Sequence, residues 1–352
     1  MYSEDTQEAV ILLKQMISIP SFSKEEEKVA DMLERSIELK GYSVARKGNN
    51  LWLMSTAFDT AKPTILLNSH IDTVKPVAGW SGDPFVPFQD NNKLTGLGSN
   101  DAGASVVSLL EAFFILTKKQ QFYNLIFAAT AEEEISGANG IESLLHELPA
   151  IHFAIVGEPT QMHAAVAEKG LMVLDCTAQG KAGHAARREG DNAIYKALKD
   201  IDWIKNYEFQ TESDLLGPVL MTVTQINAGT QHNVVPDRCS FVVDVRTNEM
   251  YSNEEVLNIV KKNMNSEVVA RSTRLSSTAT PLDHPVVLRA AEMKRKLYGS
   301  PTLSDQALMP FPSMKMGPGD SARSHTANEY ILLSEIDEAI SIYVSLLDGL
   351  VL

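Results

Sequence analysis

The sequence predicts an α/β protein in which a small α+β domain is inserted into a larger domain with a largely parallel central sheet. Three observations predict this fold class. The chain has 352 residues, enough for two domains of roughly 100–200 residues each. In its N-terminal part, short apolar runs alternate with helical stretches, which favours a parallel sheet. After about residue 165 the order changes to strand, helix, strand, strand, helix, strand.

The larger domain begins with helical patterning. Ser23-Lys24-Glu25-Glu26 has the spacing of a capping box, which predicts a helix that continues to about Lys40 and ends at Gly41. Strand-like runs lie at 42–46, 51–55, 64–68, 125–130 and 153–156, and an apolar helix is predicted at 104–118. Because these strands and helices alternate, most of the strands should pair in parallel.

The second pattern forms a unit of its own. Its predicted strands are 171–178, 219–226, 239–246 and 268–274, and its predicted helices are 192–207 and 253–264. The order β-α-β-β-α-β is that of a ferredoxin-like sandwich of helices on one sheet. Helix and short strand return from about residue 282, and an amphipathic helix at 335–347 follows. We therefore place the larger domain at 1–165 and 280–352, and the inserted domain at 166–279.

Composition and charge exclude several classes of protein. The formal net charge is −14 and no stripe of Lys and Arg is present, so we expect no nucleic-acid partner. We find no stretch long enough to span a bilayer and expect no membrane partner. The acidic start, Met1 to Asp5, does not resemble a signal peptide. Cys176 and Cys239 lie in apolar segments and are expected to be buried thiols, which favours a cytoplasmic location.

Acidic and imidazole side chains follow apolar strands at successive places along the chain. The residues are His70 and Asp72, Asp101, Glu132 and Glu133, Glu158, and near the C-terminus His325. Taken singly, each has an ordinary explanation, such as a hydrogen-bonded His–Asp pair or a solvated first turn of a helix. Together they supply the nitrogen and oxygen ligands that zinc uses, at the strand ends where open α/β sheets bind ligands.

This set, in this order, resembles the dinuclear zinc family of acetylornithine deacetylase, succinyl-diaminopimelate desuccinylase, aminoacylase and carboxypeptidase G. The resemblance covers nearly the whole chain. It implies a zinc-exopeptidase-like catalytic domain that holds two Zn²⁺ ions, with Co²⁺ or Mn²⁺ as alternatives. Asp101 would bridge the two ions. His70 and Glu158 would complete one site, and Glu133 and His325 the other.

The resemblance also implies catalytic roles for two further carboxylates. Asp72 would hold the His70 ring through its second nitrogen, which is the usual task of an outer carboxylate beside a ligating imidazole. Glu132 would be the general base that takes a proton from the water held between the metals and later passes it to the departing amine.

The inserted domain would act as a lid and as a dimerisation domain. His184 resembles the family's lid histidine, which crosses to the partner's active site in dimeric members and supports the oxyanion. Asn233, Arg246 and Gly317 match positions that contact substrate, and the Arg246 guanidinium suits an α-carboxylate. We therefore expect a homodimer. For each polar residue the alternative is a structural role, as an exposed loop histidine or a strand-end ion pair.

The sequence departs from the family pattern beside the substrate. Ser69 stands where a glycine is common, the 98–101 loop lacks its usual arginine, and the segment 185–190 lacks a proline and is one residue short. None of these changes removes an expected ligand, so they affect the substrate assignment and leave the chemistry unchanged.

The predicted activity is metal-dependent hydrolysis of the amide bond of a small N-acyl amino acid. N-acetyl- or N-succinyl-ornithine or citrulline would place the protein in arginine biosynthesis, close to acetylornithine deacetylase. The alternatives are a dipeptidase or carboxypeptidase and a succinyl-diaminopimelate desuccinylase. A non-catalytic binding protein is the remote alternative, which metal analysis would distinguish because it should hold no stoichiometric zinc.

Overall fold

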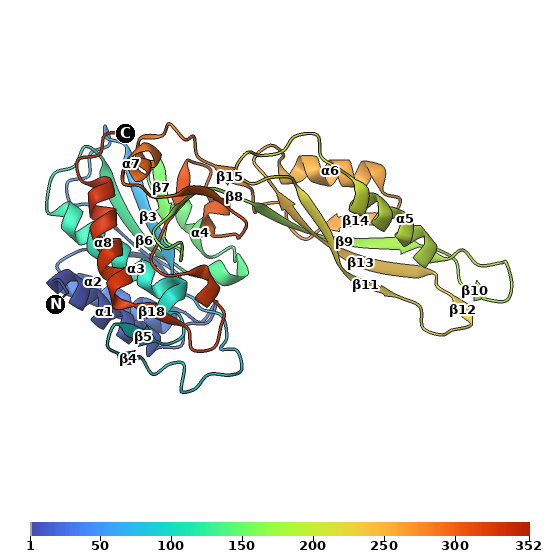
Figure 1. Ribbon diagram of the computed structural model, residues 1–352, viewed down its shortest axis with the longest axis horizontal. Coiled ribbons are helices and arrows are strands. Elements are labelled where there is room, and N and C mark those ends of the chain that lie inside the picture. The colour runs from blue at the N-terminus through green and yellow to red at the C-terminus, as the bar shows by residue number, and fades with distance from the viewer. Residues whose placement is uncertain (1) are drawn as a thin grey trace. The chain divides into compact units, whose positions relative to one another are not determined.

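The computed structural model describes residues 2–352, which divide into two compact units (Figure 1). Unit 1 comprises residues up to Val166, Thr280–Tyr298 and Ser304–Leu352. Unit 2 comprises Ala167–Ala279 and Gly299–Leu303. Each unit has its own sheet and its own buried apolar residues, so each is described separately.

The sheet of unit 1 has a parallel centre. Its strand order is β1-β2-β6-β3-β7-β17-β8, and β16 also pairs with β8. The strands are β1 (Ala45–Lys47), β2 (Asn50–Met54), β3 (Thr64–His70), β6 (Asn124–Thr130), β7 (Phe153–Val156), β8 (Ala164–Glu168), β16 (Leu297–Ser300) and β17 (Ser313–Lys315). β3 pairs in parallel with both β6 and β7, and β7 pairs in parallel with β17. The carboxyl ends of these strands therefore meet at one edge of the sheet, which confirms the predicted fold class.

Helices surround this sheet. They are α1 (Glu4–Ile17), α2 (Glu27–Leu39), α3 (Ala104–Thr117), α4 (Ile141–Leu145), α7 (Pro285–Glu292) and α8 (Leu333–Leu347). Helix α3 packs against α1, α8 and strand β3, and nearly all of its residues are buried. The segment Ser99–Thr117 is long and apolar enough to cross a membrane, which the sequence analysis missed. Because 83% of it is buried in the fold, its apolar character is explained by packing.

The N-terminus of α2 differs from the prediction. Lys24 has a positive φ of 75° and turns the chain, so the helix begins only at Glu27. Its N-cap, Glu26, makes no side-chain capping bond. Ser23 instead donates to Asp72 Oδ2 at 2.7 Å. The predicted capping box is therefore wrong, and the serine supports a carboxylate of the candidate site.

A second, three-stranded sheet in unit 1 joins two distant segments. It consists of β4 (Phe88–Asp90), β5 (Lys93–Thr95) and β18 (Tyr330–Leu332), in the order β18-β5-β4. Tyr330 pairs with Thr95 in the antiparallel register. This pairing brings the chain that follows His325 beside the chain that leads to Asp101.

Unit 2 has the predicted ferredoxin-like order. It contains β9 (Gly170–Gln179), α5 (Ala193–Asn206), β11 (Leu220–Ala228), β13 (Arg238–Thr247), α6 (Asn253–Asn263) and β14 (Glu267–Ala270). These strands form an antiparallel sheet in the order β11-β13-β9-β14. The short strands β10 (Gly183–His184) and β12 (Val234–Val235) pair with each other, and β15 (Thr278–Ala279) pairs with the end of β8.

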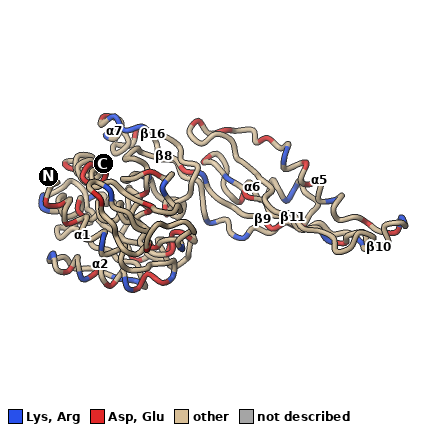
Figure 2. The backbone as a smooth tube through the Cα atoms, turned by 60° about the horizontal axis from the view of Figure 1, so that its bottom comes forward, with Lys and Arg blue, Asp and Glu red and all other residues tan. Residues whose placement is uncertain are grey.

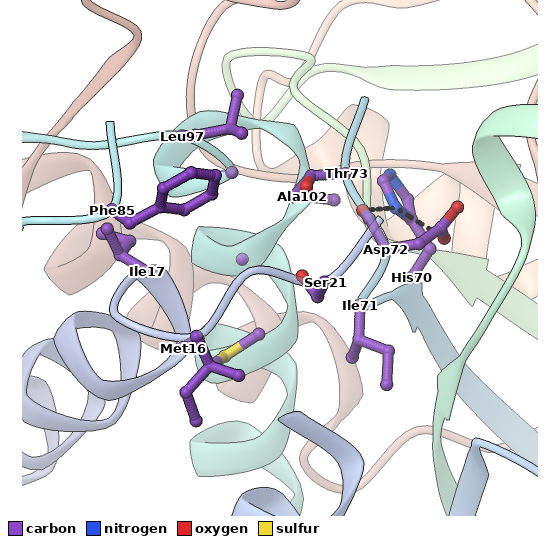
Figure 3. Close-up of a pocket in the computed structure, with 13 residues that line it drawn as sticks. Met16, Ile17, Ser21, His70, Ile71, Asp72, Thr73, Phe85, Leu97 and Ala102 are labelled. Carbon is purple, nitrogen blue, oxygen red and sulfur yellow. Dashed lines mark hydrogen bonds and ion pairs between the residues drawn. The ribbon is translucent and has the colours of Figure 1, made fainter. Parts of the chain in front are cut away.

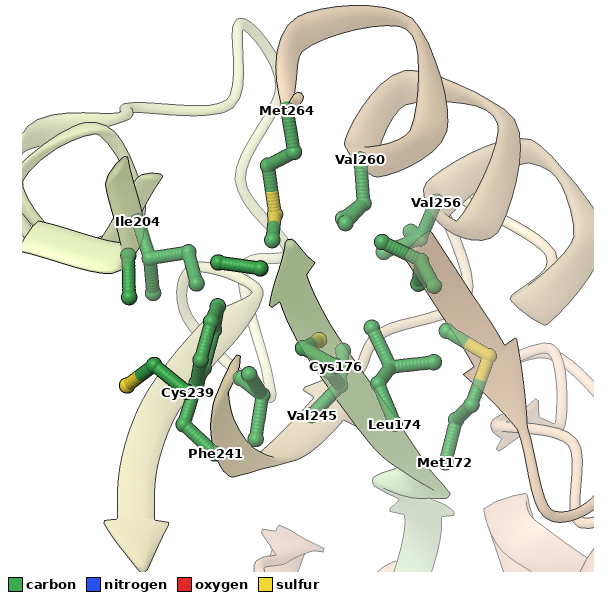
Figure 4. Packing of buried hydrophobic residues seen from close by; sticks show 14 of the residues in the cluster. Met172, Leu174, Cys176, Ile204, Cys239, Phe241, Val245, Val256, Val260 and Met264 are labelled. Atoms are coloured by element: carbon green, nitrogen blue, oxygen red, sulfur yellow. The ribbon is translucent and has the colours of Figure 1, made fainter. Parts of the chain in front are cut away.

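The core of unit 2 follows from strand alternation. Buried and half-buried residues alternate along β9 and β13, so one face of the sheet carries the apolar side chains. Figure 4 shows this face packed against helical residues such as Val256 and Val260 of α6 and Ile204 of α5. Cys176 and Cys239 are buried free thiols in this core.

Charge is distributed along both units. Figure 2 shows Lys and Arg interspersed with Asp and Glu along the described residues, without one long basic stretch. The formal net charge of the whole sequence is −14.

Candidate metal centre

Two groups of metal-ligating side chains lie at the carboxyl edge of the parallel sheet in unit 1, and Asp101 belongs to both. The first group is His70, Asp101 and Glu158, and the second is Asp101, Glu134 and His325. Within each group the ligand atoms all lie within 4.8 Å of one another. Segments that are far apart in the sequence, from residue 70 to residue 325, therefore converge at this edge of the sheet.

The first group is anchored by strand ends. His70 is the last residue of β3 and is 1% exposed, and its Nε2 lies 3.2 Å from Asp101 Oδ1 and 3.7 Å from Glu158 Oε1. Glu158 follows β7 by two residues. The intervening Gly157 donates its N–H to the Asn68 carbonyl, and an added Cβ there would meet Ser105 and Leu109 side chains at less than 3 Å. Glycine is thus required for this close approach.

The second group includes a glutamate that the sequence analysis did not select. His325 Nε2 lies 3.0 Å from Glu134 Oε2 and 3.6 Å from Asp101 Oδ2. The prediction had assigned this position to Glu133, so the structure corrects the pairing by one residue.

The conformation of Glu132 explains the correction. Glu132 has a positive φ of 57°, which turns the chain as it leaves β6. Its side chain is 6% exposed, accepts a hydrogen bond from Asn139 Nδ2 at 3.0 Å and packs against Gly137. Glu133 and Glu134, which begin a 3₁₀ turn, face the site instead: Glu133 Oε2 lies 4.0 Å from His70 Nε2. Glu132, the predicted base, is therefore held by other partners.

Asp72 supports both the histidine and the glutamates. His70 Nδ1 lies 2.9 Å from the Asp72 carbonyl oxygen and 3.4 Å from Asp72 Oδ1. The same carboxylate accepts the backbone N–H groups of Glu133 at 3.0 Å and Glu134 at 3.2 Å. One buried aspartate thus fixes the ring of one candidate ligand and the backbone of the glutamate pair.

A small cavity with both polar and apolar lining residues lies beside His70 and Asp72. Figure 3 shows side chains of Met16, Ile17, Phe85 and Leu97 among the residues that line it. His70 is 1% exposed and Asp72 is 0% exposed. A hydrogen bond between such desolvated groups is strengthened by the low local dielectric.

Burial and mutual repulsion perturb the titration of the clustered groups. Burial raises the pKa of Glu158 to about 8, and the neighbouring Asp101 adds to the shift. Burial, with a contribution from Glu158, also raises the pKa of Glu133 well above its usual range. The hydrogen bond with Glu134 raises the pKa of His325 to about 9. Such shifts show that this cluster of negative charge favours a bound cation or proton.

The residues present fit two divalent cations. Each group offers imidazole nitrogen and carboxylate oxygen, the ligand types that Zn²⁺, Co²⁺ and Mn²⁺ accept. In the metal-free chain, positive charge at the site is carried by the two imidazoles. Burial lowers the pKa of His70, but Asp101, Asp72 and the glutamates raise it overall. Cations at these positions would replace those protons.

Gly317 lies close to the first group. Its N–H donates to Thr160 Oγ1 at 3.0 Å, and an added Cβ would lie 2.5 Å from the Glu158 carbonyl oxygen. The glycine therefore permits the 317–325 segment to pass beside Glu158.

The remaining predicted residues belong to unit 2. His184 lies in β10, is exposed, and accepts the Ala186 N–H at Nδ1 at 3.1 Å. Asn233 accepts the Ala185 N–H through its carbonyl oxygen. Arg246 forms a bidentate pair with Asp244, with Nε–Oδ1 at 2.8 Å and Nη2–Oδ2 at 3.2 Å. Their predicted roles with substrate stay predictions.

Buried polar residues that no sequence motif indicated also lie around the site. Asp305 accepts hydrogen bonds from Asn68 Nδ2 at 2.9 Å and Thr130 Oγ1 at 2.8 Å, at the ends of β3 and β6. Burial raises its pKa to about 6. Asn100 and Glu329 make further contacts between the ligand-bearing loops. The only available signal was their proximity in sequence to Asp101 and His325.

A largely parallel sheet with two joined carboxylate–imidazole groups at its carboxyl edge is the arrangement of a metal-dependent hydrolase. The chain belongs to the peptidase family M20/M25/M40, whose family model matches residues 66–349.

Curated relatives match nearly the full length of the chain. A putative succinyl-diaminopimelate desuccinylase from Mycobacterium tuberculosis is 28% identical over 349 residues, which cover 95% of this chain and 96% of the relative. A [LysW]-lysine/[LysW]-ornithine hydrolase from Sulfurisphaera tokodaii is 26% identical over 353 residues, covering 97% and 95%. The names of these two relatives describe hydrolases that act on different substrates.

Solved structures share the fold. The aminopeptidase PepT from Bacillus cereus has a TM-score of 0.78 at 20% identity, covering 97% of this chain and 98% of that one. The YXEP protein from Bacillus subtilis, described as a dinuclear metal binding peptidase, has a TM-score of 0.74 at 16% identity, covering 97% of each chain. At this identity the likeness shows the fold alone.

Proposed function

We propose that the protein is a cytoplasmic two-zinc amidohydrolase that removes the acyl group from an N-acylated diamino acid. The observation that carries the proposal is the convergence of His70, Asp101, Glu134, Glu158 and His325 into two groups that share Asp101. The names of the relatives support the substrate class. Diaminopimelate, lysine and ornithine each carry two amino groups. Of the substrates expected from the sequence, N-acetyl- and N-succinyl-ornithine belong to this class, and the citrulline derivatives do not.

Each side chain has a definite task in this proposal. His70, Asp101 and Glu158 would hold one metal ion, and Asp101, Glu134 and His325 the other. When bound, the metal pair supplies Lewis acidity, which polarises the amide carbonyl and lowers the pKa of water. Glu133 faces this site and lies 4.0 Å from His70 Nε2 through Oε2. We assign it the role of general base, one residue after the position that the sequence analysis had selected.

Burial suits Glu133 to proton transfer. A carboxyl whose pKa is raised can receive a proton from water and return it to the leaving amine near neutral pH. Asp72 orients this glutamate by accepting its backbone N–H at 3.0 Å. From unit 2, His184 would support the oxyanion, and Arg246, with Asn233, would contact the substrate carboxylate. Arg246 can contact the substrate carboxylate only if its ion pair with Asp244 rearranges, or if its guanidinium binds both carboxylates at once.

The test is a substrate panel with the zinc-loaded protein. It comprises N-acetylornithine, N-acetylcitrulline, N-succinyl-diaminopimelate, an N-acyl-lysine and simple dipeptides, ranked by kcat/KM, which measures relative transition-state stabilisation. We expect an N-acylated diamino acid to rank first. A dipeptide in first place would favour the dipeptidase or carboxypeptidase alternative. A protein that binds no zinc and hydrolyses none of these compounds would refute the proposal.

We also propose that unit 2 forms a homodimer through β11. This strand is at the edge of its sheet, and none of its nine residues is buried. Leu220 and Ile226 are exposed on it, and Tyr195 and Leu198 are exposed on α5, which packs beside β11. A long edge strand with exposed apolar side chains favours pairing with a second copy.

A further inference from the structure

Two polar side chains, Asn100 and Glu329, connect the loop that carries Asp101 to the segment that carries His325. We call this pair the clasp. Glu329 is 2% exposed and lies four residues after His325. Its Oε1 accepts the backbone N–H groups of Asn100 at 2.8 Å and Asp101 at 3.0 Å, and its Oε2 accepts that of Gly98 at 3.2 Å. One carboxylate therefore fixes the backbone of the Asp101 loop.

Asn100 makes the reciprocal contacts. Its Nδ2 donates to the Asp320 carbonyl oxygen at 3.1 Å and to Ser324 Oγ at 3.2 Å, and its Oδ1 accepts the Asp320 N–H at 3.0 Å. The asparagine thus holds the residues just before His325.

The backbone around the clasp is adapted to it. Gly319 has a φ of +86°, and an added Cβ would lie 2.2 Å from Asn100 Oδ1, so only glycine permits this approach. The Glu329 carbonyl oxygen accepts the Gly96 N–H at 3.0 Å, where β18 joins β5. The clasp therefore lies next to the pairing of β18 with β5, which joins the same two segments of the chain.

The other ligands are held independently of the clasp. His70 lies on β3 and contacts Asp72, Glu158 follows β7, and Glu134 is held through its backbone by Asp72. His325, which is 53% exposed with a positive φ of 58°, depends most on its own loop. Loss of the clasp should therefore affect the group of Asp101, Glu134 and His325 more than the group of His70, Asp101 and Glu158.

We infer that Asn100 and Glu329 are positioning residues that set the spacing between Asp101 and His325 and thereby the affinity for the second metal ion. This inference rests on the proposed two-metal function. Neither residue touches the reacting atoms. Outer residues of this kind commonly change metal affinity by 10–100-fold when they are replaced.

The test is calorimetric titration of the metal-stripped full-length chain with Zn²⁺. Wild type should bind two ions per chain. Glu329→Gln removes the charge and places an amide N–H₂ group among the backbone donors, so we expect the first ion to bind nearly as in wild type and the second about 10–100-fold more weakly. Asn100→Ala should weaken the binding of the same ion. This second variant still tests the inference if Glu329→Gln does not fold.

Asp200→Asn is the matched control. Asp200 is a 2% exposed carboxylate of unit 2 that accepts the Asn265 and Ser266 N–H groups at 3.1 and 2.8 Å. The control should lower the thermal stability and leave both zinc affinities unchanged. If the clasp variants behave like Asp200→Asn, with two unchanged affinities, the inference is overturned. If wild type itself binds no zinc, the proposed function fails first.

Discussion

Three consecutive glutamates at residues 132–134 show how much the environment of one residue decides. All three residues are of the same type, so the sequence alone could indicate only that two of them face the candidate metal site. The selection depends on the positive φ of Glu132, which turns that side chain toward Asn139 and leaves Glu133 and Glu134 toward the histidines. No sequence signal predicts such a backbone conformation for a glutamate. The sequence therefore predicted that glutamate is a ligand here, but it did not predict which of the three glutamates face the site.

Substitution of Glu133 tests the corrected register. Glu133→Gln keeps the shape of the side chain but cannot accept a proton, so we expect kcat to fall by about 10²–10⁴-fold while zinc binding is retained. Glu132→Gln is the control and should keep kcat, because Glu132 contacts Asn139 and Gly137. Steady-state kinetics with metal analysis of both variants is the measurement. A loss of turnover in Glu132→Gln alone would restore the original assignment.

At the scale of elements, the sequence predicted best where periodicity was strong. The helix predicted at 104–118 and the strand predicted at 153–156 match α3 and β7 almost to the residue, because burial dictates their apolar runs. The capping box at Ser23 was wrong because that serine hydrogen-bonds Asp72, a partner 49 residues away. Tertiary contacts of this kind override a local capping pattern, and the clasp residues could not be found for the same reason.

The edge strand β11 gives a prediction about assembly. Ile226→Asp places a charge on its exposed surface, where two copies would bring like charges together, so we expect the dimer to dissociate into folded monomers. Light scattering coupled to gel filtration measures the mass. Val269→Asp on β14, the short strand at the opposite edge, is the control and should stay dimeric. A monomeric wild type would contradict the proposed interface.

At the scale of the whole molecule, many acidic groups are buried at one edge of one sheet. Burial raises the pKa of Asp305 to about 6, of Glu329 to about 7 and of Glu158 to about 8. A carboxyl with a raised folded-state pKa stabilises the fold fully below its unfolded-state pKa. That contribution is lost as the pH rises through the folded-state value. The folded chain without metal therefore favours protons in this region.

We accordingly predict that the metal-free chain loses stability between about pH 5 and pH 8. Asp72 and Asp101, whose pKa values are lowered, titrate below this window and do not oppose the trend. Because each pKa unit corresponds to about 1.4 kcal/mol, shifts of this size should lower Tm by at least several degrees. Thermal unfolding after chelation measures it, and added Zn²⁺ should reverse it. A Tm that rises with pH in the chelated protein would contradict the prediction.

The insertion of unit 2 between the two parts of unit 1 has a consequence for biosynthesis. Ligands from residues 70 to 158 precede unit 2 in the chain, and His325 follows it. During translation the ribosome therefore releases the second imidazole only after unit 2 has been synthesised, and strand β17, which pairs in parallel with β7, is synthesised just before it. Until then the nascent chain carries the three acidic ligands with only one of the two imidazoles. Contacts of such long sequence separation form late, so the candidate group that includes His325 can form only after unit 2 has been synthesised.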